Sequence, residues 1–123
     1  MTEPSLTGRS VLVVENEYLI AVALQLALEE RGATVVGPAP SVESALNLID
    51  DHPELDAAIL DINLDGTTAF PVADRLCEKR CRLVFMTGYD AVAIPARFQS
   101  HTRLEKPVDA AAVAGLIATE IAS

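Results

Sequence analysis

Short apolar runs alternate with helical stretches along this chain, and that alternation constrains the fold more than any other feature. The runs are rich in Val, Ile, Leu and Ala and show no polar alternation; they lie at residues 10–15, 34–37, 57–61, 82–87 and 102–106. Runs of this kind predict strands that are buried on both faces. A helical segment separates most of them, so the sequence predicts an α/β fold with a doubly wound parallel sheet covered by helices on both faces.

Caps and periodicity predict the helices. Residues 17–31 form one helix that ends at a left-handed Gly32, and Ser41 caps the next one. A third helix begins near Pro71 and runs to about Lys79, and Asp109 caps a final helix with an apolar face. The interval between Gly88 and Thr102 is interrupted by a proline, which predicts a short or irregular fourth helix.

Length and charge bound the function. With 123 residues, 50% of them hydrophobic, the chain suits one domain with a core at about residues 8–122. A formal net charge of −9 argues against nucleic acid or an anionic membrane surface as the main partner. No apolar run approaches a membrane span and the first ten residues do not resemble a signal peptide, so we expect a cytoplasmic protein.

Two cysteines and two histidines offer a possible metal site. Cys77 and Cys81 lie four residues apart, but His52 and His101 are both distant in sequence. We therefore expect partly buried thiols rather than a metal pair, and histidines at the surface.

Polar residues follow the predicted strands at their carboxyl ends, where open parallel sheets bind ligands. These residues are Glu15, Asn16, Glu17, Asp61, Thr87 and Lys106. No glycine follows the first strand, which disfavours a nucleotide site, and neither histidine follows a strand end, which disfavours Ser-His-Asp chemistry. The remaining interpretation is a carboxylate, Asp61, that receives a phosphoryl group beside Mg²⁺, with Lys106 and Thr87 contacting the phosphoryl oxygens.

The motifs VLVVENE, LDINLDG, FMTGY and EKP together resemble the receiver domain of two-component response regulators. The resemblance implies a (βα)5 flavodoxin-like fold with strand order 2-1-3-4-5, and a bond before Pro107 that is often cis. It also implies site roles by position. Asp61 matches the phospho-acceptor, Glu15 and Asn16 the acidic pair, Asn63 the residue whose backbone carbonyl binds the metal, and Thr87 and Lys106 the switch hydroxyl and the lysine.

FMTGYD, with PVAD at residues 71–74, is similar to a narrower subgroup, the FAT GUY receivers. These are often single-domain proteins that work with histidine kinases of the HWE or HisKA_2 type. The resemblance implies a stand-alone receiver at residues 1–123, without an output domain. It would not be an enzyme beyond self-catalysed phosphotransfer to its own aspartate, and it would act through protein contacts or as a phosphate sink.

Three positions depart from the family pattern. Asn16 stands where most receivers have an aspartate, which predicts weak Mg²⁺ binding; Glu17 could compensate through water, but is better explained as an acid at a helix N-terminus. Arg103 replaces a switching aromatic residue, for which Tyr89 or Phe98 could substitute. Asp65 replaces a proline, which predicts a less rigid loop.

Two other hypotheses remain open. A pseudo-receiver would use the same fold as a docking module without phosphorylation, as Asn16 suggests. A flavin carrier is a third hypothesis, poorly supported because aromatic residues make up only 4% of the chain.

Overall fold

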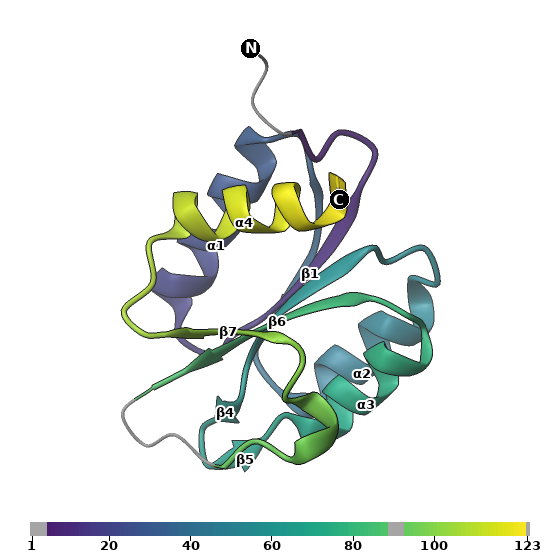
Figure 1. Ribbon diagram of the computed structural model, residues 1–123, viewed down its shortest axis with the longest axis vertical. Helices are drawn as coiled ribbons and strands as arrows, with labels where there is room; N and C mark the ends of the chain where they lie inside the picture. Colours follow the sequence, from purple (N-terminus) through teal and green to yellow (C-terminus); the bar gives the residue numbers. More distant parts are fainter. Residues whose placement is uncertain (1–4, 89–92, 123) are drawn as a thin grey trace.

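A five-stranded parallel sheet forms the centre of the computed structural model, which describes residues 5–88 and 93–122. Its strand order is β2-β1-β3-β6-β7, the 2-1-3-4-5 order of the flavodoxin-like fold, so the predicted fold class is confirmed (Figure 1). The strands are β1 (Ser10–Val14), β2 (Thr34–Ala39), β3 (Ala57–Asp61), β6 (Arg82–Thr87) and β7 (Thr102–Glu105).

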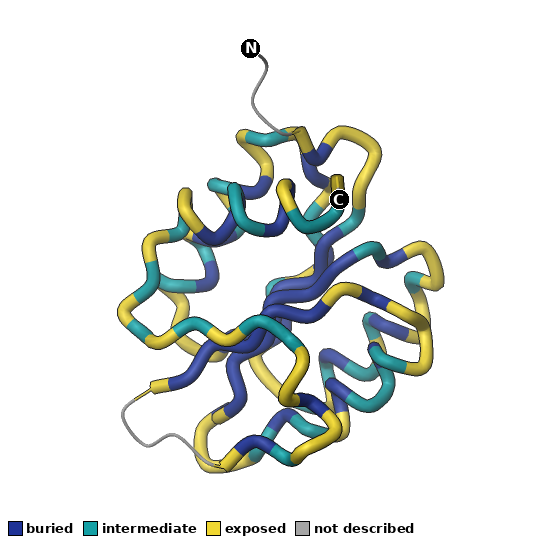
Figure 2. Tube along the Cα trace, in the orientation of Figure 1, coloured by how far each residue is buried: buried dark blue, intermediate teal, exposed yellow. Residues whose placement is uncertain are grey.

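Two pairs of helices cover the sheet, one pair on each face (Figure 1). One pair is α1 (Tyr18–Glu30) with α4 (Ala110–Ala122), and the other is α2 (Val42–Asp51) with α3 (Phe70–Glu78). The buried strands lie between these layers (Figure 2). Leu12 and Val14 pack with the α2–α3 layer, whereas Val11 and Val13 pack with the α1–α4 layer. Successive strand side chains point to opposite faces, so a strand covered on both sides must be apolar throughout.

The predicted helix caps are present. Ser41 and Ser44 form a reciprocal capping box at the start of α2. Gly32 has a φ of +95° and ends α1, where its N–H donates to the Glu29 carbonyl at 2.9 Å. Asp109 accepts a hydrogen bond from the Ala111 N–H at 3.0 Å before α4.

The prediction of an irregular fourth helix is confirmed on the residues that the structure describes. From residue 93 to residue 101 the chain carries only a short 3-10 turn, Ala96–Phe98. Phe98 is 2% exposed, and its ring lies 5.8 Å from Phe70 and 5.6 Å from Phe85, centroid to centroid. One buried aromatic side chain therefore holds this turn against α3 and β6.

A small hairpin directly after β3 was not predicted from the sequence. It joins β4 (Asn63–Leu64) to β5 (Thr67–Thr68). Asp65 and Gly66 form its two-residue loop with φ values of 54° and 89°, and Asp-Gly is a preferred pair where both central residues need positive φ. The loss of rigidity expected from Asp65 stays a prediction.

The expectation for the two histidines was wrong. Both are half-buried; His52 Nδ1 lies 2.8 Å from the Leu48 carbonyl, and His101 Nε2 lies 3.7 Å from Cys77 Sγ. The return of the chain before β7 brings His101 to α3, a contact that sequence distance does not reveal. Both cysteines are free thiols, half-buried and buried, as predicted, and the described residues hold no cluster of three metal-binding side chains.

Two glycine substitutions should separate steric overlap from backbone strain. Gly37 and Gly66 both have positive φ, at 92° and 89°. A Cβ on Gly37 would lie 2.9 Å from the Val13 carbonyl oxygen, whereas a Cβ on Gly66 meets nothing within 4 Å. We expect Gly66→Ala to cost about 1 kcal/mol of unfolding free energy and Gly37→Ala about 3 kcal/mol. Urea denaturation measures both, and equal losses would contradict this account.

Candidate functional site

The carboxyl ends of the strands bring three buried polar residues together. Glu15 follows β1, while Asp61 and Thr87 end β3 and β6, which lie side by side in the sheet. They are 2%, 3% and 8% exposed, and no other polar or charged residue of the described chain is as deeply buried. Buried charges require partners or a ligand, so this edge of the sheet is the candidate site.

Lys106 is the partner of both buried carboxylates. Its Nζ lies 2.7 Å from Asp61 Oδ2 and 2.9 Å from Glu15 Oε2. Glu17 Oε1 lies farther away, at 3.8 Å. One ammonium group thus stands between two carboxylates, and the cluster keeps a net negative charge.

Backbone N–H groups hold the other carboxylate oxygens. The Glu17 N–H donates to Glu15 Oε1 at 3.0 Å, and the Asn63 N–H donates to Asp61 Oδ1 at 3.1 Å. The Lys106 N–H donates to the Thr87 carbonyl at 2.7 Å, which ties the lysine to the end of β6. The orientation of each charged side chain is therefore set by the backbone directly after its strand.

Burial and pairing act in opposite directions on the charges of this cluster. Burial raises the pKa of Glu15, although its contacts with Lys106 and the Glu17 N–H oppose the rise. Burial alone would lower the pKa of Lys106, but its bonds to Asp61 and Glu15 outweigh this and leave the pKa raised. Lys106 therefore remains an ammonium group at neutral pH.

A hollow of about 560 Å³ opens over Asp61 and Lys106. We call it the Asp61 hollow; its lining is Glu17, Ile20, Asp61, Asn63, Gly88, Lys106 and Pro107. The bond between Lys106 and Pro107 is cis, as the family resemblance implied.

Not every predicted site residue reaches this hollow. Glu15 is buried in contact with Lys106. Asn16 and Arg103 are exposed and do not line the hollow. Phe98 is a packing residue of the core, and Tyr89 lies outside the described residues.

Ile20 lines the hollow and was not predicted as a site residue, whereas Glu17 was named among the polar residues at the strand ends but assigned mainly to the helix N-terminus. Glu17 precedes α1 without a side-chain cap bond, and its carboxylate faces Lys106 instead of serving only the helix N-terminus. Ile20 lies one turn into α1 and adds an apolar wall. The signal for Ile20 was its spacing from Glu17, since residues three apart share one helix face.

The donor set fits a small hard cation. Glu15 Oε2 is buried and accepts no hydrogen bond of good geometry, although Lys106 Nζ lies nearby. All the candidate donors are oxygens: two carboxylates, the Asn63 carbonyl and the Asn16 amide. Mg²⁺ is commonly held by one or two carboxylates and completes its shell with water, so the net negative charge suits it.

Comparison with known proteins identifies the family. The model for the response regulator receiver domain matches residues 11–117. The chain belongs to this family. Receiver domains act in two-component systems, interact with histidine kinases and generally bind Mg²⁺ at their acidic phosphorylation site.

Several relatives support the assignment. The chain is 37% identical to SdrG from Sphingomonas melonis Fr1, with a TM-score of 0.76 over 89% of this chain and 94% of that one. It is 32% identical to the photosynthetic apparatus regulatory protein RegA of Cereibacter sphaeroides, over 83% of this chain and 57% of RegA. The anti-anti-sigma factor PhyR of Bartonella quintana is 25% identical, with a TM-score of 0.72 over 91% of this chain and 48% of that one.

The chain spans between about a third and three fifths of the curated relatives, with 34% of VanR and 57% of RegA covered. Within the described residues, no helix is both long and apolar enough to cross a membrane.

Replacing Lys106 should expose the conflict between the buried carboxylates. Lys106→Met leaves Glu15 and Asp61 without their cation, and we expect a loss of about 2 kcal/mol at neutral pH, below the cost for a fully enclosed pair because the hollow is open to water. A carboxyl group whose pKa is raised in the folded state destabilises the protein as pH rises and the group ionises. The stability difference between Lys106→Met and the wild type should therefore shrink at acidic pH.

Lys79→Met provides the matched control, because Lys79 is exposed and is the chain's only other lysine. Urea denaturation of both variants, at neutral and acidic pH, measures the difference. Equal stability of the two variants would show that Lys106 does not compensate the buried charges.

Proposed function

We propose that this chain is a stand-alone receiver that accepts a phosphoryl group on Asp61 from a histidine kinase in a Mg²⁺-dependent reaction. The observation that carries the proposal is Asp61 itself, a 3% exposed carboxylate at the end of β3 with Lys106 Nζ at 2.7 Å, in the floor of an open hollow.

The proposed step is a direct transfer. An oxygen of Asp61 forms a bond to phosphorus while the bond from phosphorus to the kinase imidazole nitrogen breaks. The electron pair of that bond stays on the imidazole, which takes up a proton. Lys106 neutralises charge on the phosphoryl oxygens, and the Thr87 hydroxyl provides a hydrogen bond. Mg²⁺ would be held by Asp61, Glu15, Asn16 and the Asn63 carbonyl, and would reduce the repulsion between carboxylate and phosphate.

The partner and the output follow from the subgroup resemblance. The kinase would be of the HWE or HisKA_2 type, as the motifs FMTGYD and PVAD suggest. The phosphorylated receiver would act in the cytoplasm, through contacts with another protein or as a phosphate sink. Catalysis would be limited to phosphorylation of its own aspartate.

A pseudo-receiver is the second candidate, and one observation favours it. Asn16 is an uncharged, exposed residue at a position of the acidic pair, so one charged metal ligand is missing. A docking module with this fold would not need the metal.

Phosphotransfer from a labelled HWE or HisKA_2 kinase tests the proposal. We expect label on the wild type with Mg²⁺, none without Mg²⁺, and none on Asp61→Asn, because the substitution removes the nucleophilic oxygen. Asp65→Asn is the matched control; it removes a carboxylate from the neighbouring hairpin and should keep the label. A folded wild type that stays unlabelled in excess Mg²⁺ would favour the pseudo-receiver.

Restoring the missing carboxylate should tighten metal binding. We expect Asn16→Asp to lower the Mg²⁺ dissociation constant about tenfold, because a charged ligand replaces a neutral amide. Asn47→Asp makes the same change on the exposed face of α2 and should have little effect. Mg²⁺ titrations followed by amide chemical shifts measure both, and equal tightening would point to net charge rather than ligation.

A further inference from the structure

A second hollow lies at the opposite edge of the sheet, where the strands begin. Its volume is about 500 Å³. We call it the arginine hollow, and the lining side chains that matter here are Arg9, Asp56, Arg80, Arg82, Ser100 and His101. Arg9 precedes β1, Asp56 precedes β3, Arg82 begins β6 and His101 precedes β7, so four strands contribute at their amino ends. The phosphorylation chemistry proposed above uses none of these residues.

The charge of this hollow is opposite to that of the protein. The chain has nine lysine and arginine residues and a net charge of −9. Three of the nine line this one hollow, and Asp56 is the only carboxylate among the lining residues. Three guanidinium groups against one carboxylate give a local positive excess. A surface whose cations were merely spread for solubility would not collect a third of them in one concave place.

Most of the guanidinium hydrogen-bonding capacity remains available. Arg9 contacts Asp56 Oδ1 at 3.3 Å, and Arg82 donates to the Glu120 carbonyl at 3.1 Å. Each guanidinium has five N–H donors, so these contacts use a small part of them. No ion pair or hydrogen bond joins the Arg80 side chain to any residue in the described part of the chain.

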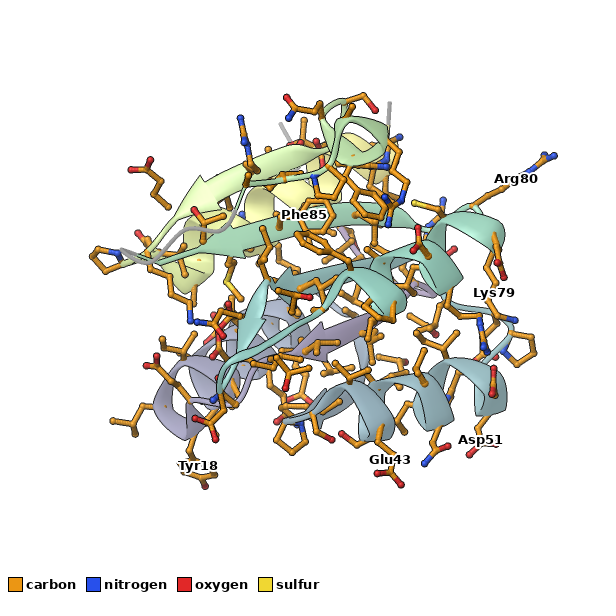
Figure 3. The ribbon with its side chains drawn as sticks, turned by 90° about the horizontal axis from the view of Figure 1, so that it is seen from below. Tyr18, Glu43, Asp51, Lys79, Arg80 and Phe85 are labelled. Carbon is orange, nitrogen blue, oxygen red and sulfur yellow. The ribbon has the colours of Figure 1, made fainter. Side chains whose placement is uncertain are left out.

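Arg80 occupies a backbone position that favours glycine. Its φ is 59°, and its N–H donates to the Cys77 carbonyl while the Cys81 N–H donates to the Leu76 carbonyl. Gly32 ends α1 with the equivalent pair of hydrogen bonds. An arginine at this left-handed position costs about 1 kcal/mol relative to an unstrained residue. The side chain extends from the body of the protein at the end opposite Tyr18, which begins α1 beside the Asp61 hollow (Figure 3).

We propose that the arginine hollow binds a small multivalent anion that carries phosphate groups. Guanidinium forks match phosphate oxygens bidentately, and arginine is the usual residue for such recognition. A single guanidinium group can bind both oxygens of a carboxylate, whereas three guanidinium groups together suit an anion with several terminal oxygens. The volume lies in the range of small-ligand sites, and Ser100 and His101 add further hydrogen-bonding groups.

Inorganic pyrophosphate is the test ligand, titrated into the metal-free protein and followed by amide chemical shifts. We expect saturable shifts at residues 80–82 and 100–101. The Arg80→Gly and Arg82→Gln double variant should weaken binding by about tenfold or more, through loss of two charge-assisted contacts. Glycine relieves the strain at residue 80, and glutamine retains an N–H for the Glu120 carbonyl, so the variant should be at least as stable as the wild type.

Arg103→Gln is the control, because it removes one exposed arginine from outside the hollow. The control variant should change the affinity for pyrophosphate by less than about twofold, because a charge lost outside the hollow acts only through screened long-range electrostatics. Equal weakening by the control variant, absence of saturable shifts, or shifts confined to the surroundings of Asp61 and Lys106 would each overturn the proposal. Malonate, a dicarboxylate, tests the phosphate preference, and binding as tight as that of pyrophosphate would overturn that preference. The titration uses metal-free protein, and the residues of the two hollows give separate amide signals. A failure of pyrophosphate binding is therefore distinguishable from a failure of phosphotransfer.

Discussion

The contact of one ammonium group with two buried carboxylates determines much of this structure. Glu15 and Asp61 lie at the carboxyl ends of neighbouring strands at nearly complete burial, a placement that would be unfavourable without Lys106 at 2.9 and 2.7 Å. The lysine is fixed by the pairing of β7 with β6 and by its own N–H on the Thr87 carbonyl. Strand order thus places the cation, and the cation makes the acidic strand ends compatible with a folded core.

The fold was largely predictable because its signals are local. The apolar runs of the central strands β1, β3 and β6 are buried on both faces, whereas the edge strands β2 and β7 are partly exposed, contrary to the prediction for all five runs. Caps such as Ser41 and Gly32 use hydrogen bonds to residues a few positions away. The hairpin after Asp61 escaped prediction because two-residue strands have no periodicity to detect. The contact of His101 with Cys77 escaped because it depends on how a long connection returns to the sheet.

The topology of a parallel sheet made the position of the candidate site predictable. The prediction of its residues was incomplete because it could not give the directions of side chains in the loops. Residues that follow parallel strands must converge at one edge, which identified Glu15, Asp61, Thr87 and Lys106. Glu17 lines the hollow and Asn16 does not, and both lie in the irregular connection between β1 and α1, where no periodicity predicts the direction of a side chain. The arginine hollow draws on residues before four strands, and no short motif marks it.

The two hollows also make the distribution of charge along the strands asymmetric. β3 runs between them, with Asp56 just before it and Asp61 at its end, and a strand of this length covers about 16 Å. An acidic end and a basic end separated in this way form a dipole along the strands. Its field is screened beyond about 8 Å at physiological salt, so it acts in the last stage of an encounter. A partner with a basic face would be turned toward the Asp61 end before any contact forms, and collisions at the arginine end would be disfavoured.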